Sequence, residues 1–120
     1  MLCHCDEVSE QPIEHGPMNA GWTDLGAAAG SVDVGLRRIR IAPGAQSTPP
    51  HVHGVEEELC YVVGGEGPSW RAGARGLTVL AYGERKADDV AWYPRSQKVF
   101  MRGLGVAFRV QEVDYWEGEA

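Results

Sequence analysis

The stretch PPHVHGVEEE at residues 49–58 is the part of this chain that most directly indicates its fold. In an extended strand, side chains two residues apart point to the same face and lie about 6.5–7 Å apart, so His51 and His53 share one face. The glycine that follows favours a reversal of the chain. We therefore predict a hairpin whose second strand, from about residue 57 to 63, places Glu58 opposite both histidines. Two imidazoles and one carboxylate that converge on a point form half of an octahedral metal site.

The same stretch resembles the first conserved motif of the cupin superfamily. That motif contains a glycine, about five residues, H-x-H, three or four residues, a glutamate, six residues and a final glycine. Here Gly44 takes the first place, one residue further from His51 than the strict pattern asks, and Gly65 takes the last. Counting back six residues from Gly65 selects Glu58 as the ligand-type glutamate.

The resemblance implies an all-β fold of the cupin type, a double-stranded β-helix or jelly-roll barrel. It also implies a divalent transition metal (Fe, Mn, Ni, Zn or Cu) held by His51, His53 and Glu58, with waters or substrate at the remaining positions. The two preceding acids, Glu56 and Glu57, are expected to be solvated charges. A metal-free barrel, in which the three ligands are a relic, stays open as an alternative.

The second cupin motif, whose histidine completes the metal site of the family, has no counterpart in this sequence. Its only local candidate lies at residues 88–103, where Pro94 matches the motif's proline and Val99 stands in place of the histidine. The apolar strand expected at 76–83 resembles one that follows the second motif in small bacterial cupins. On this alignment a pair of strands is missing after Trp70, and the chain is a truncated cupin.

Loss of paired strands from a barrel leaves sheet edges with unsatisfied backbone groups. The chain can restore closure with a strand from a second copy, with its N-terminal arm or with its C-terminal segment. Cupins often form dimers in which terminal strands add to the partner's sheet, so the resemblance implies a homodimer. A monomeric open barrel is the alternative.

Length and composition agree with one small all-β domain. A chain of 120 residues can bury a modest core, and its 16 glycines and 7 prolines argue against a helical bundle. We expect residues 1–21 to form a flexible arm and residues 22–120 to form the cupin-like barrel. Extended segments are expected at 32–42, 49–53, 57–63, 77–82, 90–93, 98–101 and 104–110.

Charge and cysteine content limit the cellular compartments and the classes of partner that we expect. The net charge of −6 argues against nucleic acid as a partner. Without a run of about 18 apolar residues or a basic, apolar start, we expect neither a membrane span nor a signal peptide, and the cytoplasm is the default location. Three cysteines fit a reducing compartment. Cys3-His4-Cys5 is spaced too tightly for a structural zinc half-site and is interpreted as part of the arm.

Four further residues are candidates for contact with a small-molecule ligand. Cys60 shares a strand face with Glu58 and is expected to point into the barrel near the metal, where packing is favoured over chemistry. Arg38 and Arg40 share one face of their strand, which either holds an anionic ligand at the barrel mouth or is simply solvated. Tyr82 either lines the pocket or packs in the core.

Three functions remain open from the sequence. The first is a metal-binding cupin that holds a small molecule in its barrel. The second is a metal-dependent enzyme of the dioxygenase or isomerase type, in which the metal orients substrate and acts as Lewis acid or oxygen activator. The third is a metal-free binding or assembly module. No general base is recognisable beyond the ligand set, so the first is favoured over the second.

Overall fold

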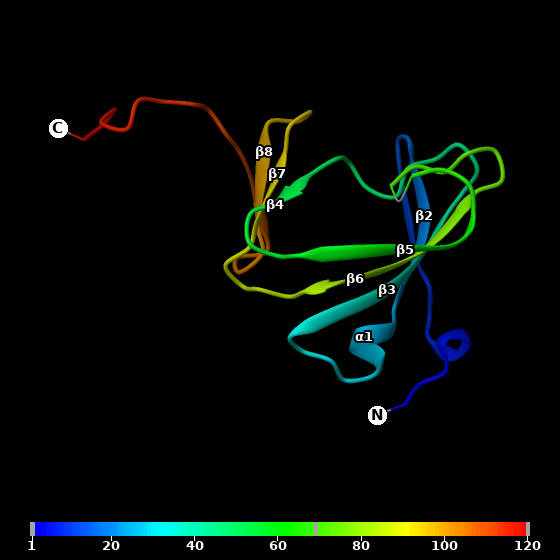
Figure 1. Ribbon diagram of the computed structural model, residues 1–120. Coiled ribbons are helices and arrows are strands. Elements are labelled where there is room, and N and C mark those ends of the chain that lie inside the picture. Colours follow the sequence, from blue (N-terminus) through cyan, green and yellow to red (C-terminus); the bar gives the residue numbers. More distant parts are fainter. Residues whose placement is uncertain (1, 69, 120) are drawn as a thin grey trace.

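Two antiparallel sheets make up most of the structure, a computed structural model that describes residues 2–68 and 70–119 (Figure 1). The larger sheet has the strand order β1-β2-β3-β6-β5, and the smaller sheet has the order β4-β7-β8-β9. The strands are β1 Gln11–His15, β2 Met18–Asp24, β3 Val34–Ile41, β4 Val52–His53, β5 Glu58–Gly65, β6 Leu77–Glu84, β7 Val90–Tyr93, β8 Lys98–Met101 and β9 Val106–Arg109. Two short helical turns, η1 Cys5–Glu7 and α1 Leu25–Ala28, precede β3.

The core lies on one face of the larger sheet. β3 and β6 pair along their whole length, from Val34 opposite Glu84 to Ile41 opposite Leu77. Side chains alternate between the faces of a strand, so every second residue of each strand contributes to the core. The buried cluster comprises Ala20, Ile39, Ile41, Ala72, Leu77, Val79 and Ala81. The predicted all-β fold is confirmed, and β6, β7 and β8 form where extended segments are expected.

The two sheets do not close into a barrel. The radius of gyration is 16.5 Å, whereas a compact domain of this length has about 13.6 Å. After β9 the chain leads away from the smaller sheet, and residues 110–119 are exposed (Figure 1). The fold is therefore an open jelly roll, and the loss of a strand pair after Trp70 stays a prediction.

The hairpin predicted between residues 49–53 and 57–63 does not form. β4 pairs with β7 in the smaller sheet, whereas β5 pairs with β6 in the larger sheet. The turn after His53 therefore carries the chain from one sheet to the other. Gly54 donates its amide hydrogen to the carbonyl of Val90 at 3.0 Å, which ties the turn to β7. Contacts between residues far apart in sequence thus separate two strands that the local pattern would join.

The boundary predicted at residue 21 between a flexible arm and the barrel falls inside β2. β1 and β2 form a hairpin, and β2 also pairs with β3 in the larger sheet. Pro12 is accommodated because β1 is an edge strand, where a missing amide hydrogen costs little. Gly16 adopts a φ of 54° in the turn. The proline and glycine that suggest a loose arm therefore mark the edge and the turn of a hairpin.

Gly65, which matches the final glycine of the first cupin motif, has a conformational reason to be glycine. It ends β5 with a φ of 88°, in the left-handed region that side chains disfavour. A Cβ atom at this position would lie 2.2 Å from the carbonyl oxygen of Gly76. The turn that follows β5 therefore depends on the absence of a side chain.

Candidate metal centre and adjoining cavity

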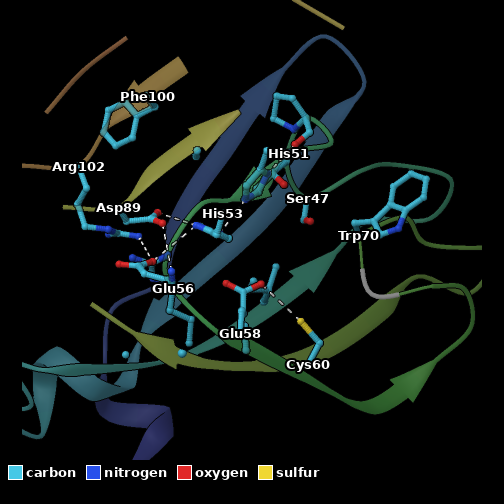
Figure 2. Close-up of a pocket in the computed structure, with 18 of the residues that line it drawn as sticks. Ser47, His51, His53, Glu56, Glu58, Cys60, Trp70, Asp89, Phe100 and Arg102 are labelled. Carbon is cyan, nitrogen blue, oxygen red and sulfur yellow. Dashed lines mark hydrogen bonds and ion pairs between the residues drawn. The ribbon is translucent and has the colours of Figure 1, made fainter. Parts of the chain in front are cut away.

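A cavity of about 590 Å³ is lined by residues of both sheets. Trp22 and Ile39 line it from the larger sheet, and Ala91 and Phe100 line it from the smaller one. Histidine and carboxylate side chains gather on its wall, among them His51, His53, Glu56, Glu58 and Asp89 (Figure 2). The two sheets therefore bring together the kinds of side chain that bind transition metals.

The two histidines point their Nε2 atoms at each other, 3.2 Å apart. His51 Nδ1 lies 2.9 Å from the carbonyl oxygen of Pro49, and His53 Nδ1 lies 2.8 Å from Asp89 Oδ2. A carbonyl and a carboxylate can only accept, so each Nδ1 must carry its ring's proton and donate it. Both Nε2 atoms then present bare lone pairs to one another. Two lone pairs at this distance repel unless a proton or a metal ion lies between them.

Pairing with β7 in the smaller sheet fixes where the histidines stand. His53 belongs to β4 and pairs with Ala91 of β7. His51 stacks on Tyr93, with ring centroids 5.1 Å apart and an interplanar angle of 27°. The two imidazoles meet almost edge to face, at 79° with centroids 4.9 Å apart. Both rings are therefore positioned by β7, which lies about forty residues later in the chain.

Asp89, which sequence reasoning missed, holds His53 and the turn after it. Its side chain is only 2% exposed. Oδ1 accepts the amide hydrogens of Val55 at 3.1 Å and Glu56 at 3.2 Å, while Oδ2 faces His53. Burial alone would raise the pKa of Asp89, but the hydrogen bonds from His53 and the two amides outweigh it and lower that pKa. The carboxylate is therefore ionised at neutral pH and fixes the tautomer of His53.

Glu56 is not a solvated charge, and that expectation was wrong. Its side chain is only 4% exposed. The carboxylate accepts the amide hydrogen of Lys86 at 2.7 Å and pairs with the guanidinium of Arg102. Sequence could not show this, because the compensating cation stands 46 residues away in the chain. A buried carboxylate needs such partners to offset the loss of its hydration.

Two groups of side chains in the described part of the chain have donor atoms within 4.8 Å of one another. They are His4, Cys5 and Asp6, all exposed at η1, and His53, Glu56 and Asp89 beside the cavity. In the second group, His53 Nδ1 and both carboxylates already bond to each other, to backbone amides or to Arg102. Nδ1 of His53 is therefore engaged with Asp89, and the other ring nitrogen of His53, Nε2, faces His51.

Glu58, the carboxylate ligand expected from the motif, lines the cavity from β5. Its Oε1 lies 3.7 Å from the Sγ atom of Cys60, which lines the same wall, and Figure 2 shows the two side chains together. Among the described residues, Glu58 does not join either group of donor atoms within 4.8 Å. The side chain is exposed, so its carboxylate is not held in that position by packing.

Comparisons with known proteins agree with this fold. No family model matches the chain, and no curated protein matches its sequence. A solved structure from Acidithiobacillus ferrooxidans, named for a proposed sugar phosphate isomerase activity, is 26% identical, with a TM-score of 0.66 over 81% of this chain and 83% of that one. A sugar phosphate isomerase of the cupin superfamily from Silicibacter pomeroyi is 20% identical, with a TM-score of 0.63 over 82% and 85% of the two chains. The chain therefore shares the fold of these two small structures.

The cavity has few histidines on its wall. Among its described lining residues, His51 and His53 are the histidines, and no third one is present. Tyr93, which supports His51, also lines the cavity. Burial raises the pKa of Tyr93, so its hydroxyl remains a hydrogen-bond donor at neutral pH. No described helix of this chain has the length and apolar character needed to cross a bilayer.

Arg38 and Arg40 lie on the face of β3 that points away from the cavity. Arg38 Nη1 lies 3.3 Å from Asp6, and Arg40 bonds to Glu10 through two nitrogens at 2.7 and 2.8 Å. Hydrogen bonding to Arg40 lowers the pKa of Glu10. Both arginines therefore tie the N-terminal residues to the larger sheet.

The arginine of β3 that does reach the cavity is Arg37, which sequence reasoning did not select. Its guanidinium lies 5.1 Å from the ring centroid of Trp22, another lining residue. Tyr82 of β6 does not line the cavity; it is 46% exposed on the outer face. The sequence predicted correctly which residues of β3 share a face. Which of the two faces borders the cavity depends on where the smaller sheet lies.

Proposed function

We propose that this chain is a cupin-type domain that binds a divalent transition metal ion through Nε2 of His51 and Nε2 of His53. The observation that carries the proposal is that the Nε2 atoms of His51 and His53 face each other 3.2 Å apart. Metal–imidazole bonds are about 2.0–2.1 Å long, so two such bonds that meet near a right angle separate their nitrogens by about 3 Å. The donor spacing therefore fits one shared ion.

Glu58 is proposed as the third ligand, in keeping with its place in the motif. Its exposed side chain on β5 is free to turn from Cys60 toward the histidines. Two imidazoles and one carboxylate suit iron, manganese, nickel, zinc or copper, with the other positions open to water or to a bound molecule. A metal held in this way supplies Lewis acidity to an oxygen of that molecule.

A small molecule is proposed to bind in the adjoining cavity. Its volume of about 590 Å³ lies within the 300–1,000 Å³ that are usual for ligand pockets. Trp22, Trp70 and Phe100 provide apolar wall, and the Arg37 guanidinium and the Tyr93 hydroxyl provide polar contacts. This combination suits a small polar ligand, and Arg37 favours one that carries negative charge.

A second candidate function is metal-dependent isomerisation of a sugar phosphate. Two observations favour it: the names of both similar structures, and a cation, Arg37, on the cavity wall. In that function Arg37 would pair with the phosphate and the two histidines would hold the metal beside the sugar. A metal-free binding module is the remaining alternative.

Elemental analysis of the untagged protein, before and after chelation, tests the proposal. We expect about one metal ion per chain, and at least a tenfold loss of affinity in His51→Ala. The matched control is His15→Ala, which removes an exposed histidine of β1 and should retain the metal. A His51→Ala variant with wild-type metal content would refute the assigned site. Sugar phosphate turnover that stops on chelation and returns with metal would favour the isomerase.

A further inference from the structure

The segment Cys3-His4-Cys5-Asp6 folds against the larger sheet through the turn η1, the dark blue coil near the N-terminus in Figure 1. His4 is the N-cap of this turn, and its Nδ1 atom accepts the amide hydrogen of Asp6 at 3.3 Å. Arg38 of β3 reaches Asp6 Oδ1 from the sheet, also at 3.3 Å, and only 22% of the Arg38 side chain is exposed. The ion pair of Asp6 and Arg38 therefore holds the turn in place.

Side chains of this turn bring donor atoms together that are held only by long contacts. One donor atom each of His4, Cys5 and Asp6 lies within 4.8 Å of the other two. Cys5 Sγ lies 3.8 Å from Asp6 Oδ1, and Cys3 Sγ lies 3.9 Å from the carbonyl oxygen of Leu25. A thiol is a weak donor, so these contacts cost little to break. In the donor group beside the cavity, by contrast, a carboxylate accepts a backbone amide hydrogen at 2.7 Å.

The imidazole of His4 offers a nitrogen lone pair to this cluster. A backbone amide can only donate, so Nδ1 of the neutral ring accepts from the Asp6 amide and the ring proton lies on Nε2. Nδ1 is also 3.8 Å from Asp6 Oδ2, so its lone pair is on the side of the cluster. The hydrogen bond of 3.3 Å is a long one, and a bond from Nδ1 to a metal ion can readily replace it.

Two thiols and one imidazole form a soft set of ligands. Thiolates favour Cu(I), zinc and iron–sulfur clusters, and imidazole also suits copper. Structural zinc and iron–sulfur clusters need a full set of protein ligands, whereas Cu(I) is stable with a low coordination number. The tight spacing of Cys3 and Cys5, which argues against a zinc half-site, is therefore compatible with Cu(I).

We propose that Cys3, His4 and Cys5 bind one Cu(I) ion at η1. The exposed side chain of Cys3 turns from its carbonyl contact to join the other two ligands. Both thiols release their protons to solvent as they bind the ion. Asp6 stays paired with Arg38 and positions the turn without binding the ion itself.

The Cu(I) site is separate from the metal centre proposed beside the cavity. Arg38 lies on the face of β3 that points away from the cavity, and none of residues 3–7 lines the cavity. The two sites also differ in their ligands. Sulfur bound to Cu(I) gives a charge-transfer absorption band in the ultraviolet, and imidazole nitrogen alone does not. Copper at η1 can therefore be measured whether or not the other site binds metal.

Anaerobic titration of the protein with Cu(I) alone, supplied as its acetonitrile complex, tests the proposal. We expect the wild type to withdraw about one Cu(I) ion per chain from the chromophoric chelator bicinchoninate and to gain the sulfur band. Cys3→Ser and Cys5→Ser should lose that band. Cys60→Ser is the matched control, because it removes another exposed cysteine and should keep the band. His51→Ala should also keep it, because the site at η1 does not involve the cavity.

The variants also show where the copper binds. Absence of the band from the wild type, or its persistence in Cys5→Ser, overturns the proposal. Loss of the band in Cys60→Ser would place the copper at the cavity wall and would overturn it as well. The far-ultraviolet circular dichroism of each cysteine variant should match the wild type, because all three cysteines are exposed. Loss of the band with an unchanged spectrum of this kind therefore reports loss of a ligand.

Discussion

Replacing Asp89 by asparagine separates two roles that this carboxylate performs at once. Oδ1 holds the turn through the amides of Val55 and Glu56, whereas Oδ2 accepts the proton of His53 Nδ1. In Asp89→Asn the amide oxygen can still accept both backbone bonds, but the amide NH2 group faces His53. The imidazole must then move its proton to Nε2, where it can donate to His51 across the 3.2 Å gap.

The expected result is a protein that folds almost normally and binds metal poorly. Stability should fall by about 1 kcal/mol, because neutral hydrogen bonds replace charged ones of similar geometry. Affinity for the metal should fall by about 10–100-fold, which is the usual effect of removing an outer partner of a ligating histidine. In contrast, Asp89→Ala leaves two buried amides and one imidazole without acceptors and should cost about 3–6 kcal/mol of unfolding free energy.

Urea unfolding and metal competition with a chromophoric chelator measure the two effects, and nitrogen NMR of the imidazoles reports the tautomer of His53. Asp88→Asn is the control, because this neighbouring aspartate is exposed. If Asp89→Asn binds metal as tightly as the wild type, the tautomer argument is wrong. If it loses as much stability as Asp89→Ala, Asp89 is structural only.

Two further predictions concern the ion pairs of Asp24 and Glu56. Burial alone would raise the pKa of Asp24, but the hydrogen bond from the Ala27 amide and the Arg85 guanidinium outweigh it and lower that pKa below 3.8. The stabilisation that ionised Asp24 provides is fully present above the ordinary aspartate pKa and is lost as pH falls through the lowered pKa. Asp24→Asn should therefore flatten the acid limb of a plot of unfolding free energy against pH. An unchanged limb would contradict the pairing. Arg102→Met leaves the buried carboxylate of Glu56 without its cation and should lower the free energy of unfolding in urea by about 2–3 kcal/mol. The double variant with Glu56→Gln should recover part of that loss. If it recovers none, the buried charge of Glu56 is not the cause.

The strands that lie at the edges of the two sheets could not be identified from the sequence. Because no second motif is recognisable, we expected open sheet edges that terminal strands of a partner would cover, and the homodimer stays a prediction. The structure instead leaves β5 as the long apolar edge, while β1 carries a proline and ionisable side chains. An edge is a property of strand order, and strand order is not encoded in the local pattern of any one strand.

The sequence by itself determined the features that depend on neighbouring residues. Alternation along an extended chain gave the shared face of His51 and His53, the two faces of β3, and the strands at β6, β7 and β8. Gly65 occupies the final position of the motif, and its backbone has a positive φ that disfavours other residues. These are short-range consequences of backbone geometry, and they need no knowledge of the fold.

Only the tertiary structure decided how the site is supported. Asp89 is 36 residues from His53, and Arg102 is 46 residues from Glu56, so nothing in the local sequence pairs them. The separation of β4 and β5 into different sheets also depends on partners that arrive later in the chain. Burial and charge compensation are set by whichever residues the fold brings together, and a linear pattern does not contain that information.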